Sequence, residues 1–192
     1  MAGLVILGAL IAVIVIVALW VIGIYNGLVR LRVQSDTSWS DIDVQLKRRY
    51  DLIPNIVETV KGYAGHEKDT LESVIKARSQ AMAAQGPAAK AQAEGMLTST
   101  LKSLFALAES YPQLRAIESF TQLQGTLGQI EDAIQNARRY YNAVVRDLNT
   151  KIAQFPSNIV AGMFNFKARE FFELEAPEER RAPRVDFGKR SE

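Results

Sequence analysis

An uninterrupted apolar run at the N-terminus limits what this chain of 192 residues can fold into more than any other feature of its sequence. Residues 3–25 carry no charged side chain. As a helix the run would be about 35 Å long, which exceeds the hydrocarbon core of a bilayer, about 30 Å. Because backbone polar groups in lipid must bond within their own segment, the run predicts a transmembrane helix. A cleavable signal peptide is the alternative, but no Lys or Arg precedes the run and its apolar core is too long. We therefore expect residues 1–25 to be an uncleaved membrane anchor.

The residues around the end of this run predict its position and direction in the membrane. Trp20 and Tyr25 lie where an aromatic belt would meet the interface, and Arg30 and Arg32 follow closely. No basic side chain precedes the run. The positive-inside rule then places everything after Arg30 in the cytoplasm and leaves a short N-terminus outside.

Residues 26–155 predict a helical domain. They are rich in Ala, Leu, Gln, Glu, Lys and Arg, which are helix formers, and their apolar positions recur at helical spacing. Proline and glycine divide them into four helices over 26–52, 54–84, 88–110 and 113–154. The fold class predicted is all-α: an N-terminal transmembrane helix followed by an antiparallel up-and-down four-helix bundle. One boundary stays open, because the apolar phase continues across Pro54. That proline could instead kink one long helix that turns near Gly62 or Gly65.

A Phe-rich segment follows the predicted bundle. Residues 155–172 contain five of the chain's eight Phe. Since the fourth helix of an up-and-down bundle returns toward the membrane, we expect a short helical segment over 156–175 at the membrane-proximal end. Candidates for contact with lipid are Phe164, Phe166, Lys167 and Arg169. The alternative is that these Phe side chains cap the open end of the bundle core. Residues 176–192, charged and Pro-containing, predict a flexible tail.

The composition argues against most catalytic chemistry. The chain has no Cys and a single His, which excludes disulfide frameworks, Cys-based metal sites and Cys nucleophiles. His66 has no partner at metal-ligand spacing, and no phosphate-binding or nucleophile motif occurs. A net charge of +2 gives no footprint for nucleic acid. We expect no cofactor, no metal and no small-molecule substrate. The remaining enzymatic alternative is a carboxylate-dependent reaction at residues such as Glu109 or Glu118.

A basic cluster is the clearest candidate for a partner surface. Lys47, Arg48 and Arg49 could touch anionic lipid headgroups or the acidic patch of a partner. The alternative is a solvated helix face that Asp41, Asp43 and Asp51 balance. Within the apolar run, the small pair Gly8 and Ala12 weakly favours association of helices, and so a homo-oligomer.

Several stretches resemble the LemA family along nearly the whole sequence. The resemblance implies a bacterial inner-membrane protein with one membrane helix, a short outside N-terminus and a four-helix bundle, and it brings no catalytic residues. The stretches that carry it are YNGLVRLR (25–32), WSDIDVQLKRRYDLIPNIVETVKGYAGHEKDTLESVIKAR (39–78), AESYPQLRA (108–116), ARRYYNAVVRDLN (137–149), FPSNIVAGMFNF (155–166) and PRVDF (183–187).

These features together predict a membrane-tethered scaffold or adaptor with no catalytic activity. Its expected partners are the lipid bilayer and other membrane proteins. A self-assembling oligomer that organises or shapes membranes is the alternative, motivated by the aromatic segment.

Overall fold

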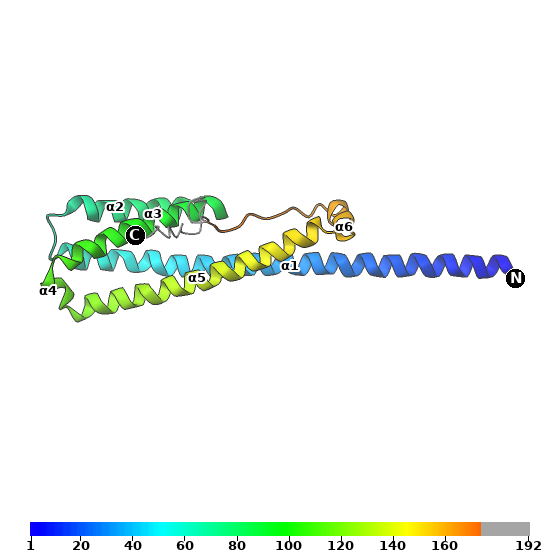
Figure 1. Ribbon diagram of the computed structural model, residues 1–192, viewed down its shortest axis with the longest axis horizontal. Coiled ribbons are helices and arrows are strands. Elements are labelled where there is room, and N and C mark those ends of the chain that lie inside the picture. The colour runs from blue at the N-terminus through cyan, green and yellow to red at the C-terminus, as the bar shows by residue number, and fades with distance from the viewer. Residues whose placement is uncertain (174–192) are drawn as a thin grey trace, which may run out of the picture.

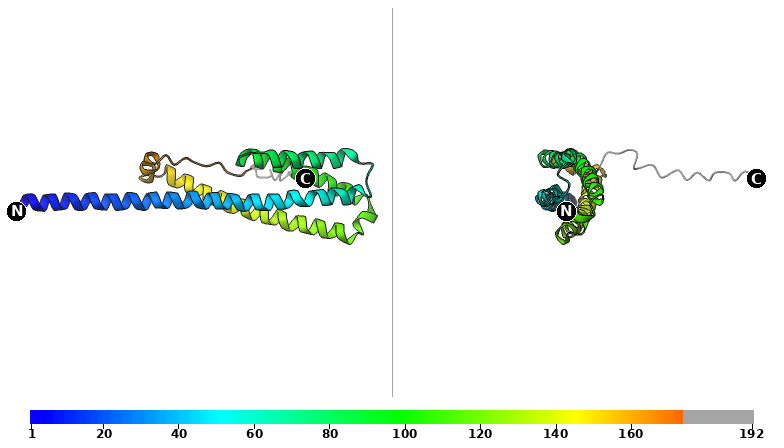
Figure 2. Two further views of the ribbon diagram at one scale, coloured as in Figure 1. Left: turned by 180° about the vertical axis from the view of Figure 1, so that it is seen from behind. Right: turned by 90° about the vertical axis from the view of Figure 1, so that its left-hand side faces the viewer.

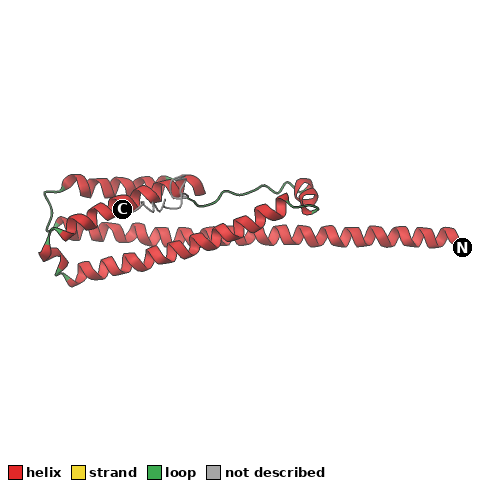
Figure 3. Cartoon of the chain, viewed as in Figure 1, coloured by secondary structure: helices red, strands yellow, loops and turns green. Residues whose placement is uncertain are grey.

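The computed structural model describes residues 1–173, and all the regular secondary structure in that part of the chain is helical (Figure 3). The all-α class and the long apolar N-terminal helix are thereby confirmed. The predicted tail over 176–192 lies outside the described residues.

One helix, α1 (Ala2–Lys61), contains both the apolar run and the first helix of the bundle (Figure 1). Its apolar part is long enough to cross a membrane, and none of its most apolar 18-residue stretch is buried by the rest of the protein. A helix in the core of a soluble protein would bury such a stretch. An exposed apolar surface of this length is what a membrane-spanning helix presents.

The first predicted boundary, a helix break before Pro54, is wrong, and the alternative of one long helix is confirmed. Pro54 lies inside α1, which ends at Lys61. A proline in a helix leaves the carbonyl four residues earlier without its usual donor, here that of Tyr50. The Arg78 Nε of α2 (Lys68–Ala83) donates to this carbonyl at 2.7 Å, so the helix can continue.

We expect Arg78→Leu to destabilise the protein by about 1–2 kcal/mol, because the half-buried Tyr50 carbonyl loses its donor. A Pro54→Ala background restores a backbone N–H that can bond to that carbonyl, so the same substitution should cost less than about 0.5 kcal/mol there. Urea unfolding of the four variants in mild detergent measures this coupling. Equal costs in both backgrounds would show that Arg78 acts through some other contact.

The remaining helices return along α1 in alternating directions. They are α3 (Pro87–Glu109), the short α4 (Pro112–Arg115), α5 (Glu118–Ala153) and α6 (Ser157–Met163). α5 packs along α1 over the longest interface, and α2 packs against α3 (Figure 2).

The four helices are unequal in length, which divides the domain into two parts. α5 has 36 residues and matches the part of α1 beyond Tyr25, whereas α2 and α3 have only 16 and 23. Four helices therefore lie together only in the distal part, away from the apolar run (Figure 1). The prediction of four helices extending over 26–155 overlooked this difference. The distal core includes Ile42, Leu46, Ile53 and Val60 of α1, Val74 of α2, Leu97 and Leu104 of α3, and Leu127 and Ile134 of α5.

Nearer the apolar run, an extended segment replaces the short helices beside α1 and α5. We call residues 166–173 the strap. Asn149 exchanges two hydrogen bonds with the backbone of Arg169, at 2.8 and 2.9 Å, and Asn142 exchanges two with that of Phe172, at 2.9 and 3.2 Å. Seven residues of helix rise about 10.5 Å, close to the reach of three extended residues. The spacing of the two Asn thus matches that of their backbone partners.

The strap also fills the core of this part of the domain. Phe172 is 3% exposed and packs against Trp39, with ring centroids 5.6 Å apart. Phe171 is half-buried against the same cluster. These two Phe side chains pack into the bundle core, as the alternative to lipid contact requires, because the chain turns back along the bundle after α6.

Candidate membrane interface and partner surface

The short helix α6 lies beside the end of the apolar run. Its Val160 and Ala161 are buried against Leu28 of α1 and Leu148 of α5. The side chains around this core come from α1, the end of α5 and the strap, and include Val21, Ile24, Tyr25, Leu31, Ile152 and Phe166. The returning chain is therefore fixed at the level where α1 leaves its apolar part (Figure 1).

The opposite side of α6 is apolar and exposed. Ile159 and Met163 stand four residues apart on α6, which places them on one face of the helix, and they are 55% and 71% exposed. Phe155, in the turn that precedes α6, is 75% exposed. Phe164 is 50% exposed. This surface lies at the level where the exposed apolar part of α1 ends, because α6 packs against Leu28. Large apolar patches of this kind mark sites of contact with lipid or protein.

Four of the predicted interface residues come together at this end. The Tyr25 ring lies 4.7 Å from that of Phe164 and 5.8 Å from that of Phe166, between centroids. The Arg32 guanidinium lies 5.2 Å from the centroid of Phe166, within the range of cation–π contact. Trp20, Arg30 and Lys167 are exposed in the same region.

The turn from α6 into the strap has a specific backbone geometry. Asn165 adopts φ 54°, a left-handed conformation that Asn tolerates better than most residues. The Phe166 N–H bonds to the Ala161 carbonyl at 2.9 Å, and the Asn165 N–H to the Gly162 carbonyl at 3.3 Å. This pair of bonds is a Schellman motif, and it ends α6 and reverses the chain.

Arg169 is not a headgroup contact, contrary to the prediction. Its Nη1 lies 2.6 Å from the Asp36 carboxylate and donates to the Ser35 hydroxyl at 3.1 Å. Asp36 stands about 16 Å along α1 from Tyr25, beyond a headgroup layer of about 5–8 Å. Arg169 instead attaches the strap to α1.

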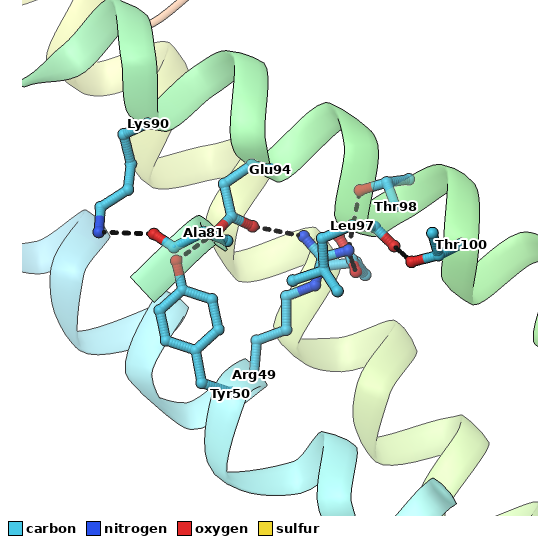
Figure 4. Close-up of polar contacts among 9 residues, drawn as sticks. Arg49, Tyr50, Ala81, Lys90, Glu94, Leu97, Thr98 and Thr100 are labelled. Carbon is cyan, nitrogen blue, oxygen red and sulfur yellow. Dashed lines mark hydrogen bonds and ion pairs between the residues drawn. The ribbon is translucent and has the colours of Figure 1, made fainter. Parts of the chain in front are cut away.

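Arg49 is not part of a partner surface either. Its side chain is 2% exposed and lies in the bundle, with Nη1 2.7 Å from Glu94 (Figure 4). Its Nη2 lies 2.9 Å from Glu131. Nη2 also donates to the Thr98 hydroxyl at 2.8 Å, and the Tyr50 hydroxyl donates to Glu94. These five residues, which we call the Arg49 network, join α1, α3 and α5. Lys47 and Arg48, by contrast, are exposed.

The sequence carried a signal for this outcome. Position 49 falls between Leu46 and Ile53 on the apolar stripe of α1, whereas positions 47 and 48 fall on its polar side. An arginine on such a stripe requires buried hydrogen-bond acceptors, and the neighbouring residues in the sequence do not identify which side chains supply them. The network's groups are bonded to one another, which favours a structural role over acid–base chemistry. Within residues 1–173, no group of three acidic or His side chains could hold a metal ion.

The Arg49 network should make stability depend on pH through Glu131. Burial raises the pKa of this carboxyl, and Arg49 offsets part of that rise. A carboxyl with a raised pKa stabilises the fold when protonated, and this contribution is lost as the pH rises through the folded pKa. We expect Glu131→Gln to be more stable than wild type near pH 8, with the difference shrinking toward pH 4. Urea unfolding across that range measures it, and a less stable variant near pH 8 would mean that the Arg49 pair outweighs burial.

Comparison with known proteins gives consistent matches. The model of the LemA family matches residues 38–187. Magnetosome protein MamQ 2 of Paramagnetospirillum magneticum is 24% identical over 175 residues, which cover 78% of this chain and 64% of that protein. Magnetosome protein MamQ of Magnetospirillum gryphiswaldense is 24% identical over 174 residues, covering 77% and 64%. Protein LemA of Metamycoplasma hominis is 26% identical over 141 residues, covering 73% and 64%. The chain thus spans 64% of the length of each of these relatives.

Proposed function

Since the chain belongs to the LemA family, with a family match over residues 38–187, we propose that it is a scaffold that holds a helical interaction surface at a membrane. It is a membrane-associated helical protein of the LemA type. The scaffold role, the absence of catalysis and the cytoplasmic orientation are the further steps that we propose.

The observation that carries the proposal is the continuity of α1. The same helix forms the exposed apolar part and the longest element of the distal core, with no break between Ala2 and Lys61. The four-helix part is therefore held at a fixed distance from the apolar part. Such an arrangement suits presentation of a surface to other membrane-bound proteins.

A groove between α1 and α5 is the surface that we propose for a partner. Its volume is about 510 Å³, and it is lined by Arg48 and Leu52 of α1 and by Ile130 of α5, among others. Apolar side chains beside exposed charges are typical of protein–protein contacts. Of the predicted basic cluster, only Arg48 lines this groove.

Photo-crosslinking in native membranes tests the scaffold role. A benzophenone amino acid at position 48 should give discrete adducts with other membrane proteins, identified by mass spectrometry. The same group at Ser103, exposed on α3, is the control. Identical adducts from both positions, or none from position 48, would contradict the proposal.

The second candidate is self-assembly into a membrane-organising oligomer. The exposed apolar face of α6 favours it, because a second copy could cover that face. Two of the relatives are named magnetosome proteins, which associates them with the magnetosome. Light scattering in mild detergent separates the candidates: a large assembly of defined mass favours the oligomer, and a monomer favours the scaffold.

We expect the bundle to face the cytoplasm, because Arg30 and Arg32 closely follow the apolar run. The chain has no Cys, so single cysteines can be introduced cleanly. In spheroplasts a membrane-impermeant maleimide should label Ala2→Cys and fail to label Ser110→Cys until the membrane is permeabilised. The reverse pattern would invert the topology.

We propose no catalytic role. Glu109 and Glu118, the carboxylates considered for one, are both exposed and lie on α3 and α5. Neither belongs to any of the four ion pairs formed within the described part of the chain. A catalytic carboxylate needs a positioned partner and a site that shields it from water, and two exposed side chains on different helices supply neither.

A further inference from the structure

A second groove lies at the level where α1 leaves its apolar part. Its volume is about 550 Å³, and its walls are α1 on one side and the end of α5 with the start of α6 on the other. The lining residues are Trp20, Ile24 and Leu31 of α1, together with Asp147, Thr150, Lys151, Gln154, Phe155, Pro156 and Ser157.

The groove changes in polarity along its length. The two walls are antiparallel, so Trp20 and Phe155 stand at the end nearer the apolar run, and Asp147 and Thr150 at the other. Trp20, at the apolar end, belongs to the exposed apolar part of α1. A phospholipid has the same order of chemistry, from acyl chain to headgroup, in the same direction relative to the bilayer.

Lys151 provides a cation at the depth that the lipid headgroups would occupy. A Cβ atom built on Gly27 would lie 2.3 Å from the Lys151 Nζ, so the ammonium lies in a notch that exists because residue 27 is glycine. Gly27 is two residues beyond Tyr25, about 3 Å along the helix axis, and therefore at headgroup depth.

The ammonium is available for an anion. None of the four ion pairs formed within residues 1–173 includes Lys151, although Asp147 lines the same groove one turn earlier on α5. The half-buried position and the apolar walls lower the local dielectric, which strengthens a charge-assisted hydrogen bond to phosphate. Thr150 and Gln154 place further hydrogen-bonding side chains on the same wall.

We propose that this groove binds one phospholipid with an anionic headgroup. Its phosphate contacts Lys151, and its acyl chain lies along Trp20, Ile24 and Phe155. This inference rests on the proposed membrane anchoring, and it adds a specific ligand class that anchoring alone does not require. The groove's apolar part is continuous with the surface that would already face lipid, which is why a lipid is its occupant.

The test uses the full chain in nanodiscs that contain equal amounts of phosphatidylglycerol and phosphatidylcholine. Native mass spectrometry after release should show one phosphatidylglycerol retained per chain in preference to phosphatidylcholine. Lys151→Gln should weaken that retention about fivefold, which corresponds to one headgroup cation. Gly27→Ala keeps the net charge but displaces the ammonium, so it should also weaken retention. Lys102→Gln removes an exposed cation on α3, away from this groove, and should change retention by less than about twofold.

Three outcomes would overturn the proposal: equal retention of the two lipids, equal losses in Lys151→Gln and Lys102→Gln, or displacement of the lipid by a second copy of the chain. Extraction of membranes with alkaline carbonate measures anchoring separately. A chain that resists extraction but retains no anionic lipid would refute the lipid site and leave the anchor intact, whereas extraction of the wild-type chain would refute both.

Discussion

Replacing Arg49 by methionine should destabilise the distal bundle by about 3–5 kcal/mol, the cost of leaving a buried charge without its partner. Arg49 is the only cation of its network, and Glu94 is 6% exposed. Without the guanidinium, Glu94 keeps only the Tyr50 hydroxyl as a partner within the network. The carboxylate must then be protonated or draw in water, and either response weakens the contact of α3 with α1.

Trp39 provides the measurement. It packs against Tyr141 and Phe172, with centroid distances of 5.3 and 5.6 Å, so its fluorescence reports on the fold. A Trp20→Phe background removes the other tryptophan, and urea unfolding in mild detergent then gives the free energy. The control is Arg48→Met, which removes an exposed charge on the same turn and should change stability by less than about 0.5 kcal/mol.

A triple variant separates the cost of an unpaired buried charge from the contribution of the network's hydrogen-bond geometry. Arg49→Met combined with Glu94→Leu and Glu131→Leu removes all of its charges, and most of the lost stability should return. A triple variant as unstable as Arg49→Met alone would mean that the hydrogen-bond geometry, and not the unpaired charge, determines the cost.

Releasing the strap should have the next largest effect. Asn142→Leu and Asn149→Leu together remove four side chain–backbone hydrogen bonds, and each is worth about 0.5–1.5 kcal/mol. We expect strap docking to weaken by about 2–4 kcal/mol in the double variant. Hydrogen exchange measures it directly, because the amides of Arg169 and Phe172 donate to these two side chains.

The control for the strap is Asn136→Leu, which alters an exposed Asn on the same helix whose partner is Arg139. Exchange at Arg169 and Phe172 should not change in that variant. If the double variant also leaves their protection unchanged, burial of Phe172 and the ion pair of Arg169 with Asp36 hold the strap, and the Asn pairs contribute specificity without measurable stability.

The sequence was sufficient for the elements whose signal is local. The apolar run was sufficient to predict the helix that contains it. The helix predicted over 88–110 agrees with α3 to within one residue at each end, because Gly86-Pro87 and Pro112 bound it. The predicted start of the last long helix at 113 was wrong: the chain forms the single-turn α4 and then begins α5 at Glu118. No strong breaker marks that interruption.

The features that were missed depend on partners far away in the sequence. Pro54 is tolerated because Arg78, on another helix, takes the freed carbonyl. The strap is held by hydrogen bonds from Asn142 and Asn149 to its backbone. The spacing of these two Asn predicts nothing until the extended segment that they bind is known to lie beside them. Arg49 was placed on the surface because its acceptors, Glu94 and Glu131, lie 45 and more residues away.

The unbroken α1 also makes the molecule a lever. Beyond Tyr25 the helix continues for about 54 Å, at about 1.5 Å per residue, so a change of about 10° in its tilt within the bilayer would swing the distal tip by about 9 Å. Membrane helices change tilt to match the local hydrocarbon thickness. With α6 as a brace against α1, a difference in bilayer thickness at one end becomes a displacement of the interaction surface at the other. Bilayer thickness would then determine which neighbours the distal tip can reach.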